Sequence, residues 1–142
     1  MSISARNVFS GVVTGLGIDS VNSQVELTTA GGDKIIAVVT SASVAELGLA
    51  LGKPANAYVK APWVMVQAGP SDIRFSARNH LAGIVRQVTK GAVNSKVVVE
   101  LPGGTPVSAV ITNEAALELA LKPGVPAAVL FKASHVILGV PA

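Results

Sequence analysis

The sequence predicts an all-β protein that consists of two tandem five-stranded barrels, each with one short helix. The first observation is a repeat: residues 4–66 and 76–138 align at a spacing of 72 residues without a gap, with about two dozen identities among 63 positions. The second is an alternation of apolar and polar residues, which is typical of half-buried strands. A repeat this long indicates small domains rather than a solenoid. We expect a first domain at residues 1–66, a linker at residues 67–73 and a second domain at residues 74–142.

Both copies are expected to follow the order strand, strand, strand, helix, strand, strand. A glycine pair, at residues 31–32 and again at 103–104, supplies a tight turn between the second and third strands, where positive φ costs glycine little. The expected strands lie at residues 7–18, 21–29, 34–40, 55–61 and 64–66, and in the second copy at residues 80–90, 93–101, 107–112, 127–133 and 136–138.

A short helical segment follows the third strand of each copy. In the first copy it covers residues 43–49, where Ser43 and Glu46 have the spacing of a capping box. In the second copy it covers residues 113–119, and Asn113 can cap it. Five strands with one helix between the third and the fourth is the order of the small Greek-key barrel of the OB type. The sequence therefore predicts two OB-type barrels.

Composition narrows the class of protein. Half of the residues are hydrophobic and only 13% are charged, which is well below the usual fraction. Two small domains with so few charges have apolar surface to cover, so we expect large subunit interfaces. No apolar run reaches the roughly 18 residues of a membrane span, the first residues lack the apolar segment of a signal peptide, and cysteine is absent. We expect a cytoplasmic protein with no membrane partner.

The chain offers little for catalysis. His80 and His135 are not related by the repeat, so no histidine recurs beside a nucleophile in both copies. No cluster of His, Asp and Glu has the spacing of metal ligands, and no phosphate-binding glycine motif follows a strand and opens a helix. We therefore expect no catalytic residues, no catalytic cofactor, no directly ligated metal ion and no enzymatic activity.

The polar residues that recur most clearly carry hydrogen-bond donors. Ser-Ala-Arg-Asn precedes the first strand of each copy, Val-Asn-Ser opens the second, threonine ends the third and Lys-Ala follows the fourth. Arginine offers a planar fork of donors, lysine a compact charge, and backbone N–H groups at strand ends can form an anion-binding nest. None of these residues is a carboxylate. Such a set is suited to a compact oxyanion.

The lack of an acceptor favours particular oxyanions. Phosphate keeps a proton at neutral pH and needs an acceptor for it, whereas sulfate, molybdate and tungstate are fully deprotonated. A pocket of donors therefore favours these dianions over phosphate. One arginine, one lysine and several neutral donors can neutralise two charges when the site is shielded from water. The same residues can also be explained without a ligand, because basic residues at strand ends are commonly solvated and Ser and Asn near glycine commonly form turns.

In combination and order, these motifs resemble the Mop domain of molbindins, and the chain is similar to a tandem, two-domain member of that family. The resemblance rests on residues 4–7, 31–35, 43–49 and 58–61, and on residues 76–79, 91–94 and 109–113. It implies OB-type barrels, binding of molybdate or tungstate without catalysis, and intracellular molybdenum storage or homeostasis. It also implies assemblies of six Mop domains, which would make this chain a homotrimer.

Carried over by position, the resemblance implies two classes of oxyanion site, in which molybdenum is held as molybdate. The first class would be lined by Ser4, Ala5, Arg6, Thr40, Lys60 and Ala61, and by their counterparts Ser76, Ala77, Arg78, Thr112, Lys132 and Ala133. The second class, near the threefold axis, would be lined by Ser20, Val21, Asn22 and Ser23, and by Ala92, Val93, Asn94 and Ser95. Because the first class is shared, its arginine and lysine can come from different domains.

The two copies are not equivalent at these positions. Asp19, which would repel a dianion, stands where the second copy has Gly91. Pro62 and Trp63 stand where it has Ser134 and His135. The pockets of the two copies therefore differ in one wall, and the copies can bind unequally.

Two alternative functions remain open from the sequence. An OB-type barrel can bind nucleic acid, but this function usually needs aromatic stacking platforms and a basic groove, and the five aromatic residues form no repeated pair. We therefore expect no nucleic-acid partner. A ligand-sensing regulator is the second alternative, although no helix-turn-helix precedes the barrels in this sequence.

Overall fold

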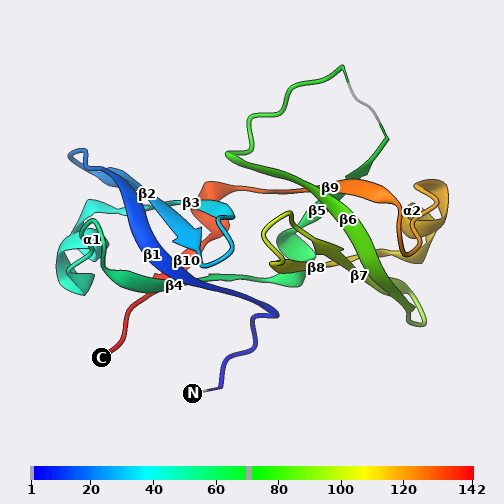
Figure 1. Ribbon diagram of the computed structural model, residues 1–142, viewed down its shortest axis with the longest axis horizontal. Helices are drawn as coiled ribbons and strands as arrows, with labels where there is room; N and C mark the ends of the chain where they lie inside the picture. The colour runs from blue at the N-terminus through cyan, green and yellow to red at the C-terminus, as the bar shows by residue number, and fades with distance from the viewer. Residues whose placement is uncertain (1, 70–71) are drawn as a thin grey trace.

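The computed structural model describes residues 2–69 and 72–142 and contains two five-stranded antiparallel sheets (Figure 1). The first half of the chain forms β1 (Asn7–Gly17), β2 (Asn22–Thr29), β3 (Lys34–Thr40), β4 (Pro54–Val59) and β5 (Met65–Ala68). The second half forms β6 (Asn79–Lys90), β7 (Asn94–Glu100), β8 (Pro106–Thr112), β9 (Pro126–Phe131) and β10 (Ile137–Gly139). The predicted fold class, two tandem OB-type barrels, is confirmed. Met1, Pro70 and Ser71, which belong to the expected first domain and linker, lie outside the described residues.

The two sheets exchange their fifth strands, which the sequence did not predict. One sheet has the order β10-β4-β1-β2-β3 and the other the order β5-β9-β6-β7-β8. Leu138 of β10 pairs with Ala57 of β4, and Val66 of β5 pairs with Val129 of β9. Each barrel is therefore completed by the other repeat. Strand β5 also continues to Ala68, within the segment that was expected to be a linker.

Short 3-10 turns carry the chain from one sheet to the other. Turn η1 (Ala61–Trp63) follows β4 and packs against β8, and turn η2 (Ala133–His135) follows β9 and packs against β3. Pro62 lies at the first turn of η1, where its fixed φ and missing N–H are tolerated. These turns redirect the chain after the fourth strand, and the fifth strand therefore joins the opposite sheet.

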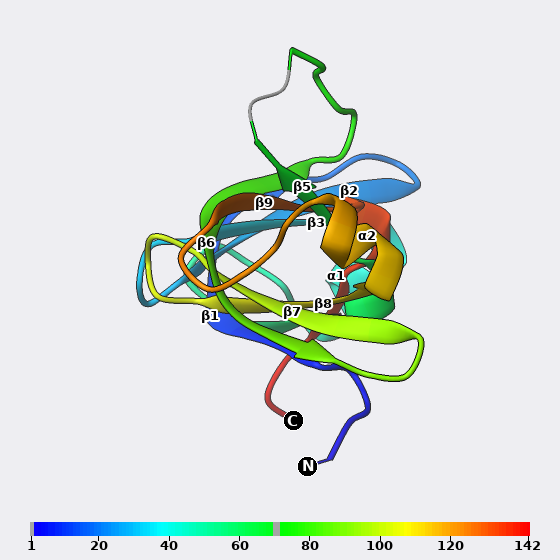
Figure 2. The ribbon, with the colours of Figure 1, turned by 90° about the vertical axis from the view of Figure 1, so that its right-hand side faces the viewer.

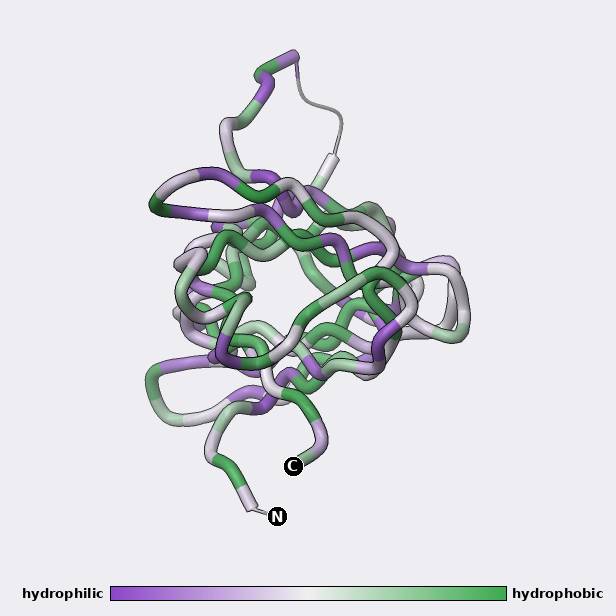
Figure 3. Tube along the Cα trace, turned by 90° about the vertical axis from the view of Figure 1, so that its left-hand side faces the viewer, coloured by the Kyte–Doolittle hydropathy of each residue, from purple (hydrophilic) through white to green (hydrophobic). Residues whose placement is uncertain are grey.

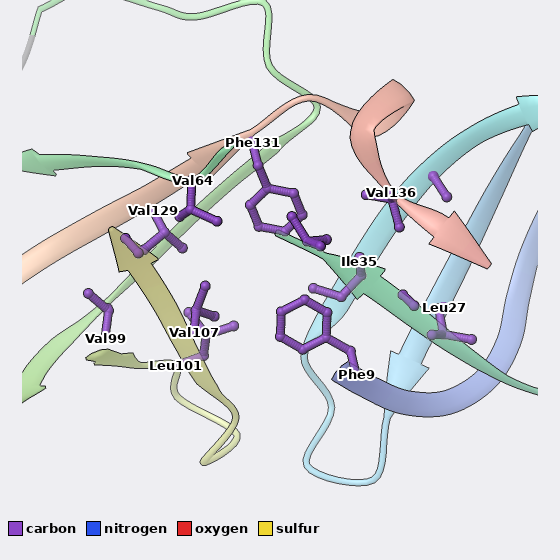
Figure 4. Close-up of a cluster of buried hydrophobic side chains, with 14 of the residues drawn as sticks. Phe9, Leu27, Ile35, Val64, Val99, Leu101, Val107, Val129, Phe131 and Val136 are labelled. Carbon is purple, nitrogen blue, oxygen red and sulfur yellow. The ribbon is translucent and has the colours of Figure 1, made fainter. Parts of the chain in front are cut away.

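The hydrophobic core is continuous across both halves. Phe9 of β1 and Phe131 of β9 stack at its centre, with ring centroids 6.3 Å apart and an interplanar angle of 13° (Figure 4). Figure 4 shows Leu27 and Ile35 on the Phe9 side and Val107 and Val129 on the other side. Seen along the long axis, strands from both sheets surround a common centre (Figure 2). The two small repeats thus share one core, which enlarges the apolar area that each can bury.

Two buried asparagines join the edge strands of one half to the other half. The Asn79 side chain accepts a hydrogen bond from the Ile36 N–H and donates one to the Ile36 carbonyl, both at 2.8 Å. Asn7 makes the same pair with Ser108 of β8, at 2.7 and 2.8 Å. Strands β3 and β8 are the outer strands of their sheets, so each asparagine satisfies backbone groups that the sheet leaves open. This structural role explains why asparagine ends both Ser-Ala-Arg-Asn motifs.

The glycine turns predicted between the second and third strands of each copy meet one another. Gly31 lies directly against the backbone of Gly103, where a side chain on either residue would collide with the opposite turn. The Asp33 carboxylate accepts hydrogen bonds from the N–H groups of Gly103 and Thr105, at 3.0 and 3.4 Å. Glycine is needed here for close backbone approach as well as for the turn.

The helices start two residues or less from the predicted positions, but the predicted caps were wrong. Helix α1 (Ser41–Leu47) begins after Thr40, whose hydroxyl accepts a hydrogen bond from the Ser43 N–H at 3.1 Å. Helix α2 (Asn113–Glu118) begins after Thr112, which accepts from the Ala115 N–H at 3.1 Å. Both threonines have extended backbone angles, as an N-cap requires, whereas Ser43 and Asn113 are already helical.

Hydrophobic and hydrophilic residues are interspersed along the chain (Figure 3), and in several strands buried and exposed residues alternate. Strand β2 illustrates this, because Ser23, Val25 and Leu27 are buried while Asn22 and Gln24 are exposed. Within residues 2–69 and 72–142, neither helix has the length and apolar character that a membrane crossing requires.

Candidate anion-binding site

A cavity of about 390 Å³ brings together five of the residues that the sequence predicts as ligands. These residues come from two segments, one directly before β6 and the other directly after β9. Because Asn79 pairs with Phe131 in this antiparallel ladder, the residue before β6 and the residue after β9 lie next to each other. The predicted residues that line the cavity are Ser76, Ala77, Arg78, Lys132 and Ala133.

The cavity is positively charged and contains no carboxylate among its lining residues. Arg78 and Lys132 are exposed, and neither takes part in an ion pair within the described residues. Ser76 adds a hydroxyl group. The remaining wall is largely apolar and is formed by Val38, Met65, Phe75 and Leu130, with Ser134 as a further polar group. An anion placed here would meet two uncompensated cations and partial shielding from water.

The sequence comparison grouped Thr40 with Lys60 and Thr112 with Lys132, but the structure places these threonines differently. Thr40 lines a neighbouring cavity of about 370 Å³, which shares Val38 and Ser134 with the Arg78–Lys132 cavity. Thr112, which the positional match grouped with Lys132, lines neither of these cavities. The strand exchange accounts for the difference, because η2 packs on β3 of the first half and brings Ser134 towards Thr40. Both threonine hydroxyls also serve as helix caps.

The corresponding residues of the first copy occupy equivalent backbone positions. Asn7 pairs with Val59 in the β1–β4 ladder, which places Arg6 beside Lys60. The Arg6 Nε atom donates a hydrogen bond to the Ser4 carbonyl at 3.2 Å. The Lys60 ammonium lies 5.4 Å from the centre of the Trp63 ring, within cation–π range. Ala61 is buried at the start of η1.

The second predicted class of residues lies in the β1–β2 and β6–β7 turns. Ser23 and Ser95 are buried, and their hydroxyls hold the turns: Ser23 bonds to the Ser41 hydroxyl at 2.7 Å, and Ser95 donates to Asn113 Oδ1 at 2.6 Å. The remaining residues of the two turns are exposed and present backbone groups and short side chains to the surface. They are Ser20, Val21 and Asn22 in the first turn and Ala92, Val93 and Asn94 in the second.

Two features of the site and its surroundings were missed from the sequence. Val38, Met65 and Phe75 form much of the apolar wall, and the first two belong to the other half of the chain. Trp63 and His135, which occupy the same position in the two copies, are in contact, with ring centroids 4.7 Å apart and an interplanar angle of 37°. Their equivalence in the repeat was the available signal, because residues at the same position can meet where two similar halves face each other.

The described residues contain no group of three or more His, Cys, Asp or Glu side chains that could hold a metal ion. The arrangement instead offers donors to an anion. This property agrees with the known proteins that the chain resembles.

The profile of the TOBE domain matches the chain twice, at residues 3–66 and 76–138. The molybdenum-pterin-binding protein MopA of Rhodobacter capsulatus is 45% identical over 141 residues, which is 99% of this chain and 53% of MopA. The molybdenum transport protein ModE of Azotobacter vinelandii is 43% identical over 140 residues, covering 99% of this chain and 52% of ModE. The chain thus spans about half the length of these curated relatives.

A solved structure matches the whole chain. It is a crystal structure of ModG, described as a cytoplasmic molybdate-binding protein, in a form with molybdate bound. It is 51% identical, has a TM-score of 0.94, and the match covers 99% of this chain and 100% of ModG. On these findings, and with the repeated barrels described above, the chain belongs to the TOBE domain family and contains two copies of that domain.

Proposed function

We propose that this protein binds molybdate, and tungstate in the same way, without catalysing a reaction. The observation that carries the proposal is the cavity in which Arg78 and Lys132 face the same space with no carboxylate in its lining. Support also comes from ModG, which matches the full chain and whose crystal structure holds molybdate.

The chemistry of the cavity suits a tetrahedral dianion. The Arg78 guanidinium can donate two parallel hydrogen bonds, and the Lys132 ammonium adds a compact charge, so the two together match the charge of the ligand. Hydrogen bonds to an ionised partner contribute about 1.5–3 kcal/mol each. The apolar wall reduces competition from water and strengthens these bonds. A proton on hydrogen phosphate would lack a carboxylate to accept it.

The proposed sites extend to both copies and both predicted classes. Arg6 and Lys60 form the equivalent site in the first copy, and the exposed turns at residues 20–22 and 92–94 form the second class. In the first turn the Ser20 N–H already donates to the Asp19 carboxylate at 2.8 Å, so the second turn offers the better anion site. The buried serines that close these turns position the backbone rather than contact the ligand. We further propose that the sites lie at domain and subunit interfaces.

Exposed apolar residues support assembly into a homotrimer. Val21 and Val93 lie at the tips of the two turns and are 70% and 71% exposed. These valines would be covered if the turns of three subunits met on one axis. The proposed role is cytoplasmic molybdenum storage and homeostasis, with neither nucleic acid nor a membrane as partner.

Titration calorimetry with sodium molybdate tests the proposal. Arg78→Ala and Lys132→Ala should each weaken binding by about tenfold or more, because each removes a charge-assisted hydrogen bond. Lys96→Ala is the matched control, since Lys96 is exposed on β7 outside the cavity. Unchanged titrations for both cavity variants would contradict the site, and salt-dependent binding of single-stranded oligonucleotides would favour the nucleic-acid alternative. Native mass spectrometry of the same samples gives the number of subunits.

A further inference from the structure

A third cavity lies at the far end of the second half, between α2 and the ends of β6 and β7 that face it. Its volume is about 500 Å³, which is within the range of small-molecule sites. Val88, Ala116 and Leu121 line it with apolar surface, and Lys90 and Lys122 line it with charge. It shares no lining residue with the Arg78–Lys132 cavity.

The two lysines are specific to the second copy. Ile18 occupies the position of Lys90 in the first copy, and Ala50 occupies that of Lys122. Both lysines are exposed, and neither ammonium takes part in an ion pair within the described part of the chain. In a chain with only 13% charged residues, two lysines without an ion-pair partner face one cavity, whose lining contains the single carboxylate of Glu114, and this excess of positive charge favours an anionic partner.

Two apolar features of the cavity are also absent from the first copy. Leu117 is 81% exposed, the highest value among the exposed large hydrophobic residues of the described chain, and the first copy has Ala45 there. Ala120 has a φ of 50°, and it is the one non-glycine residue with positive φ among residues 2–69 and 72–142. The equivalent Gly48 adopts a φ of 64° at no such cost. The Ala120 side chain makes this backbone conformation strained, and Ala120 also lines the cavity.

The inner polar groups of the cavity are already satisfied. Ser95 donates to Asn113 Oδ1 at 2.6 Å, and Asn113 Nδ2 donates to the Gly91 carbonyl at 2.9 Å. The ammonium groups of the lysines therefore remain as the donors for a ligand. Glu114 also lines the cavity, and its carboxylate would repel a compact dianion that had to sit deep inside. This combination differs from the Arg78–Lys132 cavity, which has no carboxylate.

We propose that this cavity binds an amphipathic organic anion. Its apolar body packs against Leu117 and Ala120, and its acidic group lies at the rim between Lys90 and Lys122. The proposal does not depend on molybdate binding in the Arg78–Lys132 cavity, because the two cavities share no lining residue. Ser95, which closes the β6–β7 turn, lines the α2 cavity, so the organic anion would bind next to the second class of proposed oxyanion residues. It assigns to the second copy a site that the first copy lacks.

Binding of the fluorescent anion 8-anilinonaphthalene-1-sulfonate to the full chain tests the proposal, with amide chemical shifts in NMR spectra to locate it. We expect shifts at Leu117, Ala120 and Leu121. Lys90→Ile and Lys122→Ala, which restore the residues of the first copy, should each weaken binding about threefold, as for an exposed ion pair. Leu117→Ala should weaken it about tenfold through lost apolar burial.

Each outcome of the experiment decides for or against the site. Lys96→Ala again serves as the control and should leave binding unchanged. Shifts that map to another surface, or equal binding by the wild type and the double variant Lys90→Ile/Lys122→Ala, would each overturn the proposal. Because all substituted residues are exposed, folding of the variants is checked directly in the same NMR spectra.

Discussion

Removing the Asn79 side chain should destabilise the protein far more than its size suggests. The Asn79→Ala substitution deletes two hydrogen bonds of 2.8 Å, to the N–H and to the carbonyl of Ile36. Asn79 is 1% exposed, so water cannot readily replace the lost amide. Each backbone group left without a partner costs about 1–3 kcal/mol, and the free energy of unfolding should fall by about 3 kcal/mol in total.

Urea unfolding followed by circular dichroism at a fixed protein concentration measures this change, because oligomers make apparent stability depend on concentration. Asn56→Ala is the control: its side chain donates one hydrogen bond of 3.2 Å to the Tyr58 hydroxyl within the same sheet, and the loss should stay below about 1 kcal/mol. Asn7→Ala should match Asn79→Ala, since its two bonds to Ser108 have nearly the same lengths.

Asn79→Asp separates hydrogen bonding from simple packing. The carboxylate still accepts from the Ile36 N–H but sets a second oxygen against the Ile36 carbonyl, so this nearly isosteric change should be at least as damaging as the alanine. The reasoning is refuted if Asn79→Ala costs no more than the Asn56 control, or if Asn79→Asp is tolerated.

Three further predictions concern the junction of the two halves. Gly31→Ala should lower the free energy of unfolding in urea by about 2 kcal/mol or more, because its methyl group would collide with the opposite turn. Gly17→Ala is the control and should be nearly neutral, because no atom lies nearer than 4.0 Å to the added carbon. Equal effects of the two substitutions would contradict this prediction. Phe131→Ala should cost about 3–5 kcal/mol by the same measurement, and a loss below about 1 kcal/mol would show that the central stack contributes little. Trp63 is the single tryptophan, and the Lys60 ammonium lies over its ring, so molybdate that binds Lys60 and moves the ammonium off the ring should change the Trp63 fluorescence. The change should disappear in Lys60→Met. An identical change in that variant would exclude Lys60 as the cause.

The sequence predicted the repeat, the strand order and the positions of the helices, because these depend on local alternation and on turn residues. It did not predict which fourth strand each fifth strand joins. Val66 and Leu138 follow fourth strands of nearly the same pattern, so either pairing satisfies the same apolar periodicity. The conformation of η1 and η2 decides which sheet each fifth strand joins. Each turn is only three residues long, and its sequence does not show the direction in which the chain leaves it.

Prediction of the candidate site succeeded where it relied on adjacent strand ends. Arg78 and Lys132 line the same cavity because Arg78 directly precedes β6, Lys132 directly follows β9, and these two strands pair antiparallel. It was less successful where a polar residue has a structural use as well. Thr40 and Ser95 both carry the expected hydroxyl, but the first caps a helix and the second closes a turn. Sequence alone does not separate these uses, because they require the same donor and acceptor groups.

The exchange of β5 and β10 means that this chain is, in effect, an intertwined dimer whose two members have been joined by a covalent tether. In this arrangement a single repeat would leave one edge of its fourth strand unpaired, and a strand from a second molecule could close the barrel there. Fusion makes that partner permanent at a high effective concentration. It also frees the halves from strict symmetry, so that one can acquire changes such as Asp33 or Lys122 without imposing them on the other.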